Sequence, residues 1–247
     1  LLYAPGGDPM GAWHTFPLPN HRIAVVIGGS SSPVYGRILV FSIRKFKPGI
    51  DAPYIMSEAI ESIDVSTFAL AQAGVTFSNP YSVAIDKAEN WYVADAGANM
   101  VIKITKKGKY SVFAQFPPIK NTLSSGPPTV EAVPTKIVAG NNGRFYVSLF
   151  TGFPYPDGLA KIYELDSWGK KYTHASGLSR IIDMHYDKGT GEIHALQYGT
   201  FGPDPNLGFE PLTAKITKIS ADGKKFTTIA ERVDPAGGVA LDKWGSI

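Results

Sequence analysis

The sequence contains no cysteine. Disulfide bonds, thiolate chemistry and zinc sites built on cysteine are therefore excluded. The compartment stays open, because a chain of 247 residues can bury a core large enough to fold without disulfides. Long apolar runs are also missing. None approaches the roughly 18–20 residues that a membrane-spanning helix needs, so we expect no membrane span.

The chain also has little net charge and lacks the common catalytic motifs. Its formal net charge is +3, and its lysines are scattered over many segments. Because nucleic-acid binding requires a clustered basic face, we expect no nucleic-acid partner. The sequence has no G-x-S-x-G, no P-loop and no dinucleotide-binding glycine pattern after a strand. These absences remove several enzyme classes without naming a function.

What the sequence does contain is a repeat. Each copy has an apolar strand, a turn rich in Asp, Asn or Gly, and a second apolar strand. The copies are NPYSVAIDKAENWYVADAG (79–97), VPTKIVAGNNGRFYVSLFTG (133–152), RIIDMHYDKGTGEIHALQYG (180–199) and the shorter PAGGVALDKWGSI (235–247). Repeats of this length are typical of propellers, solenoids and arrays.

The segments between the copies repeat as well. Residues 101–116, 160–177 and 214–232 each predict a strand, a tight glycine turn and a strand. Two hairpins per repeat give a four-stranded blade, with strands A to D, and blades arranged radially form a β-propeller. A β-sandwich gives no reason for this period, and a β-helix has shorter repeats. We predict one all-β propeller domain of four-stranded antiparallel blades over residues 1–247.

Several phrases resemble those of a known family. SNPYSVAIDKAENWYVADAGAN, VPTKIVAG, SLFTGFPYPDGLAKIYEL and ASGLSRIIDMHYD are similar to the ScyD/ScyE family over roughly residues 20–247. That family has an NHL-like six-bladed propeller and is distantly similar to SMP-30 and strictosidine-synthase-like propellers. The resemblance implies six blades and a secreted or extracellular protein, periplasmic in a bacterium. It implies no activity, because propellers host many functions.

The N-terminal region does not follow the repeat cleanly. Residues 1–4 resemble the second strand of a blade, and residues 21–43 resemble the B and C strands of another. About half a blade separates the two. We expect a six-bladed ring with incomplete or jointly closed terminal blades, in which the two ends of the chain pair. The alternative is that the sequence lacks residues near 7–12 and at its C-terminus.

Long B-to-C loops mark one rim of the predicted propeller as the binding face. They are residues 28–36, 150–158 and 198–212, whereas the turns at the opposite rim are short. Loops longer than a turn requires commonly carry binding residues. Their aromatic residues could stack on a planar ligand or a sugar. Alternatively, they could only pack the loops against the rest of the domain. The ligand-binding candidates are Asp95, Asn99, Phe153, Tyr155, Tyr198 and Phe201.

The inner strands place polar residues around the central channel. The candidates are Asn79, Ser82, Lys136, Asp183 and His185. The register brings Lys136 toward Asp183. Asp183 is therefore paired, hydrogen-bonded or a metal ligand. His185 lies on the same side of its strand as Asp183 and is a candidate base, although a hydrogen-bonded core histidine is the more common case.

Calcium is the one cofactor with a candidate ligand set. Asp183, Asp95 and Asn79 offer the oxygen ligands that Ca²⁺ uses. Acidic residues common in the similar family are replaced here by Leu149 and Gln197, which favours a structural ion pair over a metal site.

Three functions remain open at this point. The first is a secreted propeller that binds a small molecule, glycan or protein on its long-loop face. The second is a cation-dependent hydrolase or lactonase, or a condensing or lyase-type enzyme, that works in the channel. The third is a structural or storage protein.

Overall fold

The computed structural model describes residues 2–3, 9–10, 12–29, 35–47, 54–204, 208–242 and 245–247. Within these ranges the chain forms four four-stranded antiparallel sheets and two two-stranded sheets. The helical segments described are short: α1 (Ser66–Leu70) and the 3₁₀ turns η1 (Met56–Glu58) and η2 (Asn141–Gly143). Among the described residues, no helix has the length and apolar character needed to cross a bilayer.

Each four-stranded sheet follows the chain from strand A to strand D. The first blade is β3 (Ala12–Leu18), β4 (Arg22–Ile27), β5 (Arg37–Ser42) and β6 (Glu61–Asp64). The second is β7 (Pro80–Ile85), β8 (Trp91–Asp95), β9 (Met100–Ile104) and β10 (Tyr110–Gln115). The third is β13 (Pro134–Ala139), β14 (Phe145–Leu149), β15 (Ala160–Leu165) and β16 (Lys171–Leu178). The fourth is β17 (Ile181–Tyr186), β18 (Ile193–Gln197), β19 (Ala214–Ile219) and β20 (Phe226–Val233).

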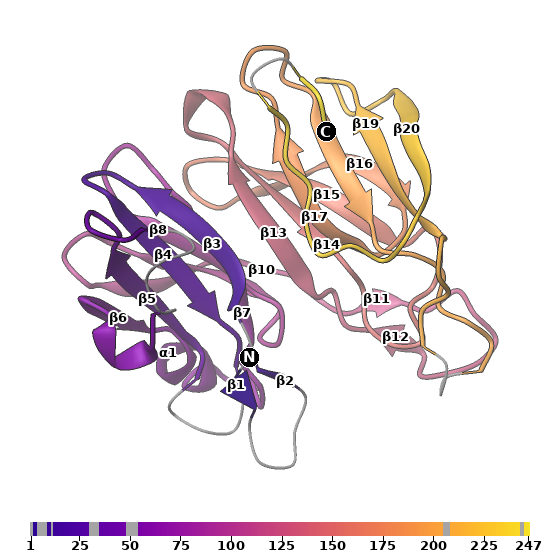
Figure 1. Cartoon of the computed structure of the whole chain (residues 1–247). Coiled ribbons are helices and arrows are strands. Elements are labelled where there is room, and N and C mark those ends of the chain that lie inside the picture. The colour runs from indigo at the N-terminus through magenta and orange to yellow at the C-terminus, as the bar shows by residue number, and fades with distance from the viewer. Residues whose placement is uncertain are drawn as a thin grey trace.

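The four sheets stand side by side with their A strands innermost (Figure 1). β7 contacts both β3 and β13, and β13 contacts β17. This radial order of antiparallel sheets confirms the β-propeller with four-stranded blades. The described residues form four blades rather than six, so the predicted blade number is wrong. The A strands of these four blades begin at residues 12, 80, 134 and 181.

The N-terminal prediction also needs correction. β1 (Leu2–Tyr3) pairs with β2 (Pro9–Met10) in a separate two-stranded sheet and does not join a four-stranded blade. Residues 22–27 and 37–42 are B and C strands, as predicted. The second small sheet joins β11 (Ile119–Lys120) to β12 (Thr129–Val130), in the link between the second and third blades.

The core lies between the faces of neighbouring blades. Val83, Val93 and Ile102 of the second blade pack with Val26 and Ile38 of the first. Because a blade is covered on both faces, its middle strands are apolar at successive positions and do not alternate with polar residues. β8 shows this, since its last four residues are all buried.

Candidate functional site

One register position on the inner strands faces the axis in every blade. It holds His14, Ser82, Lys136 and Asp183. Ile137 N donates to Ser82 Oγ at 2.9 Å. Val239 N donates to Asp183 Oδ2 at 2.9 Å. Ser82 and Asp183 thus each accept the backbone N–H that follows the same position on the next inner segment, and these bonds tie neighbouring blades together around the axis.

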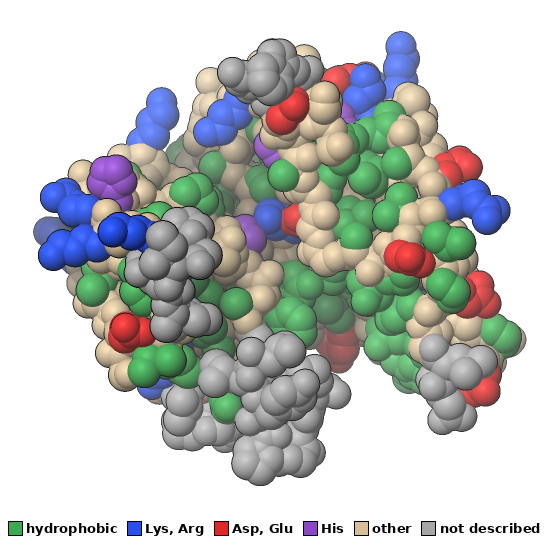
Figure 2. Space-filling model, in the orientation of Figure 1, with side chains coloured by type: hydrophobic (Ala, Val, Ile, Leu, Met, Phe, Trp, Pro, Cys, Tyr) green, Lys and Arg blue, Asp and Glu red, His purple; other side chains and the backbone are tan. Residues whose placement is uncertain are grey.

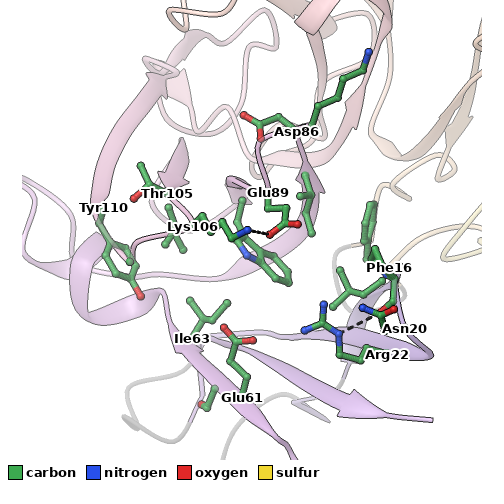
Figure 3. A pocket seen from close by; sticks show the side chains of 18 residues that line it. Phe16, Asn20, Arg22, Glu61, Ile63, Asp86, Glu89, Thr105, Lys106 and Tyr110 are labelled. Carbon is green, nitrogen blue, oxygen red and sulfur yellow. Dashed lines mark hydrogen bonds and ion pairs between the residues drawn. The ribbon is translucent and has the colours of Figure 1, made fainter. Parts of the chain in front are cut away.

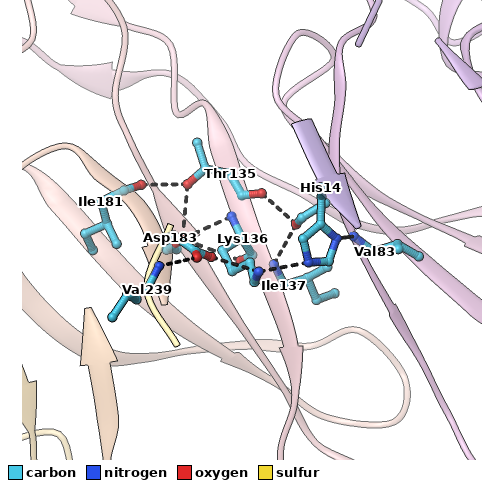
Figure 4. A network of polar contacts seen from close by, with 10 residues as sticks. His14, Val83, Thr135, Lys136, Ile137, Ile181, Asp183 and Val239 are labelled. Atoms are coloured by element: carbon cyan, nitrogen blue, oxygen red, sulfur yellow. Dashed lines mark hydrogen bonds and ion pairs between the residues drawn. The ribbon is translucent and has the colours of Figure 1, made fainter. Parts of the chain in front are cut away.

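Lys136 lies at the centre of this network (Figure 4). Its Nζ is 2.8 Å from Asp183 Oδ1 and 2.9 Å from His14 Nε2. The Lys136 and Asp183 side chains are only 14% and 12% exposed. Figure 2 shows that this side of the molecule is hollowed at its centre, where a histidine, a basic and an acidic side chain meet. The predicted approach of Lys136 to Asp183 is therefore a largely buried ion pair.

His14 is a neutral member of the network. Burial, and then the positive charge of Lys136, lower the pKa of His14 to about 3. The geometry agrees, because Val83 N lies 3.3 Å from Nδ1 while the Lys136 ammonium faces Nε2. An imidazolium would carry a proton on Nδ1, and Nδ1 could then no longer accept the Val83 N–H.

We expect acid to destabilise the protein through His14. Unfolding frees this imidazole to bind a proton near pH 6.5, whereas the folded chain binds it only near pH 3. The free energy of unfolding therefore falls as the pH drops through this window, by up to about 1.4 kcal/mol per pH unit. Urea unfolding between about pH 7 and pH 4.5 should show a steeper decline for the wild type than for His14→Gln. Equal slopes would contradict the assignment, since the lowered pKa values of His174 and His194 act in both proteins.

Two aromatic residues, Trp13 and Tyr81, directly precede the axis residues His14 and Ser82 on β3 and β7. The Trp13 and Tyr81 rings stack with centroids 5.4 Å apart and planes at 17°. Trp13 is 41% exposed. Burial, followed by the negative charge of Asp183, raises the pKa of Tyr81, with Tyr198 as a further contributor. Tyr81 therefore stacks on the exposed Trp13 and lies within the electrostatic influence of Asp183.

The long loops of the third and fourth blades form one aromatic cluster. Its rings lie 4.9–5.9 Å from their neighbours. Its members are Phe150, Phe153, Tyr155, Tyr198, Phe201 and Phe209. Phe150 is buried, whereas Phe153 is 53% exposed. Most of these rings therefore hold the loops together, and Phe153 offers the largest free surface.

Arg180 hydrogen-bonds to both loops of this aromatic cluster. Its side chain is 4% exposed and donates to Tyr155 O at 2.7 Å, to Asp157 Oδ1 at 2.6 Å and to Gly199 O. Arg180 itself has a φ of 44°, a conformation that non-glycine residues seldom adopt. The Arg180 guanidinium therefore holds the two loops together through these bonds.

Asp95, Asn79 and Asn99 have structural partners. Asp95 is fully buried and accepts Ser78 Oγ, Asn79 N and Ala98 N at 2.6–3.0 Å. Asn79 Oδ1 accepts Gly29 N at 3.0 Å. Asn99 bridges to the next blade link, because its Nδ2 donates to Glu131 and its Oδ1 accepts Val133 N. Asn99 also lines a shallow cavity of about 530 Å³ on the long-loop rim.

The predicted metal ligands do not converge. Asp95 and Asn79 bond to each other, while Asp183 is paired with Lys136. In the described part of the chain, no group of three or more acidic or histidine side chains is placed to hold a metal ion. His185 lies on β17 opposite His194 of β18, farther along the strand than the ion pair.

Sequence reasoning missed His14, Trp13 and Tyr81. The segment AWHTFPLP reads poorly as a strand because of its two prolines. In the structure Pro17 lies in β3, the innermost strand of its blade, where one edge needs no sheet partner. The NH turn that follows this segment and the apolar run of β4 after it were the available signals of a hairpin.

No protein-family model and no curated protein matches the chain. Solved structures share its fold at low identity. The extracellular domain of a candidate one-component system from B. thetaiotaomicron has a TM-score of 0.50 and 12% identity, covering 98% of this chain and 26% of that one. A candidate 6-phosphogluconolactonase from Bacteroides fragilis has a TM-score of 0.50 and 12% identity, covering 93% and 57%. A protein of unknown function from Bacteroides thetaiotaomicron has a TM-score of 0.51 and 15% identity, covering 87% and 46%.

These similarities support the propeller fold and go no further. The chain spans between about a quarter and just over half of the length of these three structures. The ScyD/ScyE resemblance remains a prediction.

Proposed function

We propose that the chain is a secreted β-propeller binding module that holds a glycan, or a small ring-shaped molecule of similar polarity, at the mouth of its channel. The observation that carries this proposal is the exposed Trp13 stacked on Tyr81 beside the His14, Lys136 and Asp183 network. An exposed aromatic face beside polar groups suits a sugar, which offers C–H groups on one face and hydroxyls at its edge.

The electrostatics favour a neutral ligand. The charge of Lys136 is balanced by Asp183 at 2.8 Å, and His14 is neutral above about pH 3. A strongly charged ligand would have to break this ion pair, which costs free energy. A neutral hydroxyl could hydrogen-bond to the pair without breaking it. The aromatic cluster around Phe153, Tyr155, Tyr198 and Phe201 provides further ring surface on the same rim.

Secretion is part of the proposal. It is supported by the resemblance of the sequence to a secreted family and by the similar extracellular domain from B. thetaiotaomicron. A hydrolase that works in the channel is less well supported. Asp183 forms an ion pair with Lys136, and the Asp95 carboxylate accepts hydrogen bonds from Ser78 Oγ and Asn79 N.

The test is a screen of neutral oligosaccharides with the whole chain, followed by calorimetric titration of the best binder. We expect Trp13→Ala to weaken binding about tenfold, or about 1.4 kcal/mol, because the ligand loses its stacking surface. Trp168→Ala is the matched control, since Trp168 is 86% exposed in the C-to-D turn at the opposite rim. Unchanged affinity in Trp13→Ala, or no binding by any oligosaccharide, would reject the proposal.

A further inference from the structure

Neighbouring blades contact each other closely at the C-to-D turns in two of the three described interfaces. In the third blade, a Cβ added to Gly169 would lie 1.9 Å from Phe113 O of β10. In the fourth blade, a Cβ added to Gly223 would lie 1.9 Å from His174 O of β16. The equivalent Gly108 of the second blade has no such atom within 4 Å. The turn of the second blade therefore does not rest on the first blade.

The length of strand D explains this gap. β6 of the first blade has four residues, whereas β10 has six and β16 has eight. A cavity of about 630 Å³ opens where a longer strand would lie, and Gly108 is part of its lining. This volume falls within the range of small-molecule sites.

The floor of the cavity is apolar. Phe16, Leu18 and Ile63 of the first blade face Trp91 and Tyr110 of the second, and all five also pack against the core between these blades. A ligand that covers them would bury apolar surface that the shorter β6 leaves open.

Hydrogen-bond donors without protein acceptors line the same cavity. Among the described residues, Arg22 donates only through Nε, to Pro19 O at 3.2 Å, so its Nη groups have no acceptor. The hydrogen bond and charge of Lys106, and then the positive charge of Arg22, lower the pKa of the Glu89 carboxyl. The Tyr110 hydroxyl and the Trp91 indole N–H also have no acceptor in the described part of the chain. Figure 3 shows Tyr110 and Arg22 on opposite sides of the cavity.

The other charged groups of the lining are mostly occupied. Lys106 Nζ pairs with Glu89 Oε2 at 2.6 Å. Asp86 is held by Asn90 and by the Tyr92 hydroxyl. Glu61 lies beside Ile63, away from the turn that carries Asp86 and Glu89 (Figure 3). The Nη groups of Arg22 therefore remain available to a ligand, and the Glu61 carboxylate lies in the same lining.

We propose that this cavity is a second binding site, for a small amphipathic anion that places one or two apolar rings on Phe16, Ile63 and Trp91 and a carboxylate or sulfonate on Arg22. The Arg22 fork can donate both Nη groups to two oxygens of such an anion. The cavity lies at the short-turn rim, so the site is separate from the channel mouth.

The probe is 8-anilinonaphthalene-1-sulfonate, titrated into the whole chain and followed by its fluorescence. We expect saturable binding that Arg22→Gln weakens about tenfold or more, because the anion loses its charged donors. Arg44→Gln is the matched control, since Arg44 is exposed and outside the lining. The neutral analogue N-phenyl-1-naphthylamine should bind at least about tenfold more weakly than the sulfonate.

Other variants separate this site from general effects. Arg22→Lys keeps the charge but loses the fork, so its affinity should fall between the wild type and Arg22→Gln. Trp13→Ala should leave binding of the sulfonate unchanged. The test of this cavity is therefore independent of the test of glycan binding at the channel mouth. The proposal is overturned if no saturable binding occurs, if Arg44→Gln weakens binding as much as Arg22→Gln, or if the neutral analogue binds equally well.

Discussion

Lys136→Met should lower the free energy of unfolding by about 3 kcal/mol, because it leaves the buried Asp183 carboxylate without its cation. The Asp183 side chain is only 12% exposed, so water replaces the lost partner poorly. Methionine is unbranched and only one heavy atom shorter than lysine, so the effect reports mainly the lost charge. Urea unfolding at neutral pH, compared between the wild type and the variant, gives the difference directly.

Two further variants make this result specific. Lys106→Met removes the exposed partner of Glu89, whose pair is 67% and 65% exposed, and should change stability by less than about 1 kcal/mol. The double variant Lys136→Met with Asp183→Leu should recover much of the loss, since it removes both charges together. If Lys136→Met costs no more than Lys106→Met, the ion pair does not stabilise the axis.

Asp95→Ala should cost about 4 kcal/mol, the largest effect expected for a single side chain. Its carboxylate accepts Ser78 Oγ, Asn79 N and Ala98 N, and it is fully buried. Alanine leaves these three donors without an acceptor, and an unsatisfied buried group costs about 1–3 kcal/mol. For a chain of this size we expect the melting temperature to drop by about 8–16 °C.

The control for Asp95 is another aspartate with a similar set of donors at the surface. Asp187 accepts Gly189 N and Thr190 Oγ1 in an exposed turn, where water can replace it. Asp187→Ala should therefore cost about 1 kcal/mol or less. If the two variants melt at the same temperature, the buried bonds of Asp95 do not hold the link between the first and second blades.

The blade pattern could be predicted because its causes are local. The segment from Asn79 to Asn99 has the pattern of two apolar strands joined by a turn and followed by a second tight turn. The structure has β7 and β8 there, and the Asp86 side chain accepts hydrogen bonds in the turn between them. The number of blades could not be predicted in this way. It was taken from a resemblance, whereas the described chain forms four blades.

The candidate site was only partly predictable. The register brought Lys136 toward Asp183, because equivalent positions of inner strands face one axis. It did not reveal His14, which contacts Lys136 although 122 residues separate them. A Pro-rich segment gave no strand signal there, and only packing against β7 makes it an inner strand.

The sequence by itself determined the antiparallel four-stranded blades, because strand alternation and turn chemistry act between residues close together in the chain. Only the tertiary structure decided which side chains meet at the axis, that Trp13 stacks on Tyr81, and that the short β6 leaves a cavity beside Gly108. These features depend on how whole sheets pack against one another. Such packing is set by the summed contacts of many distant residues, and no short stretch of sequence contains it.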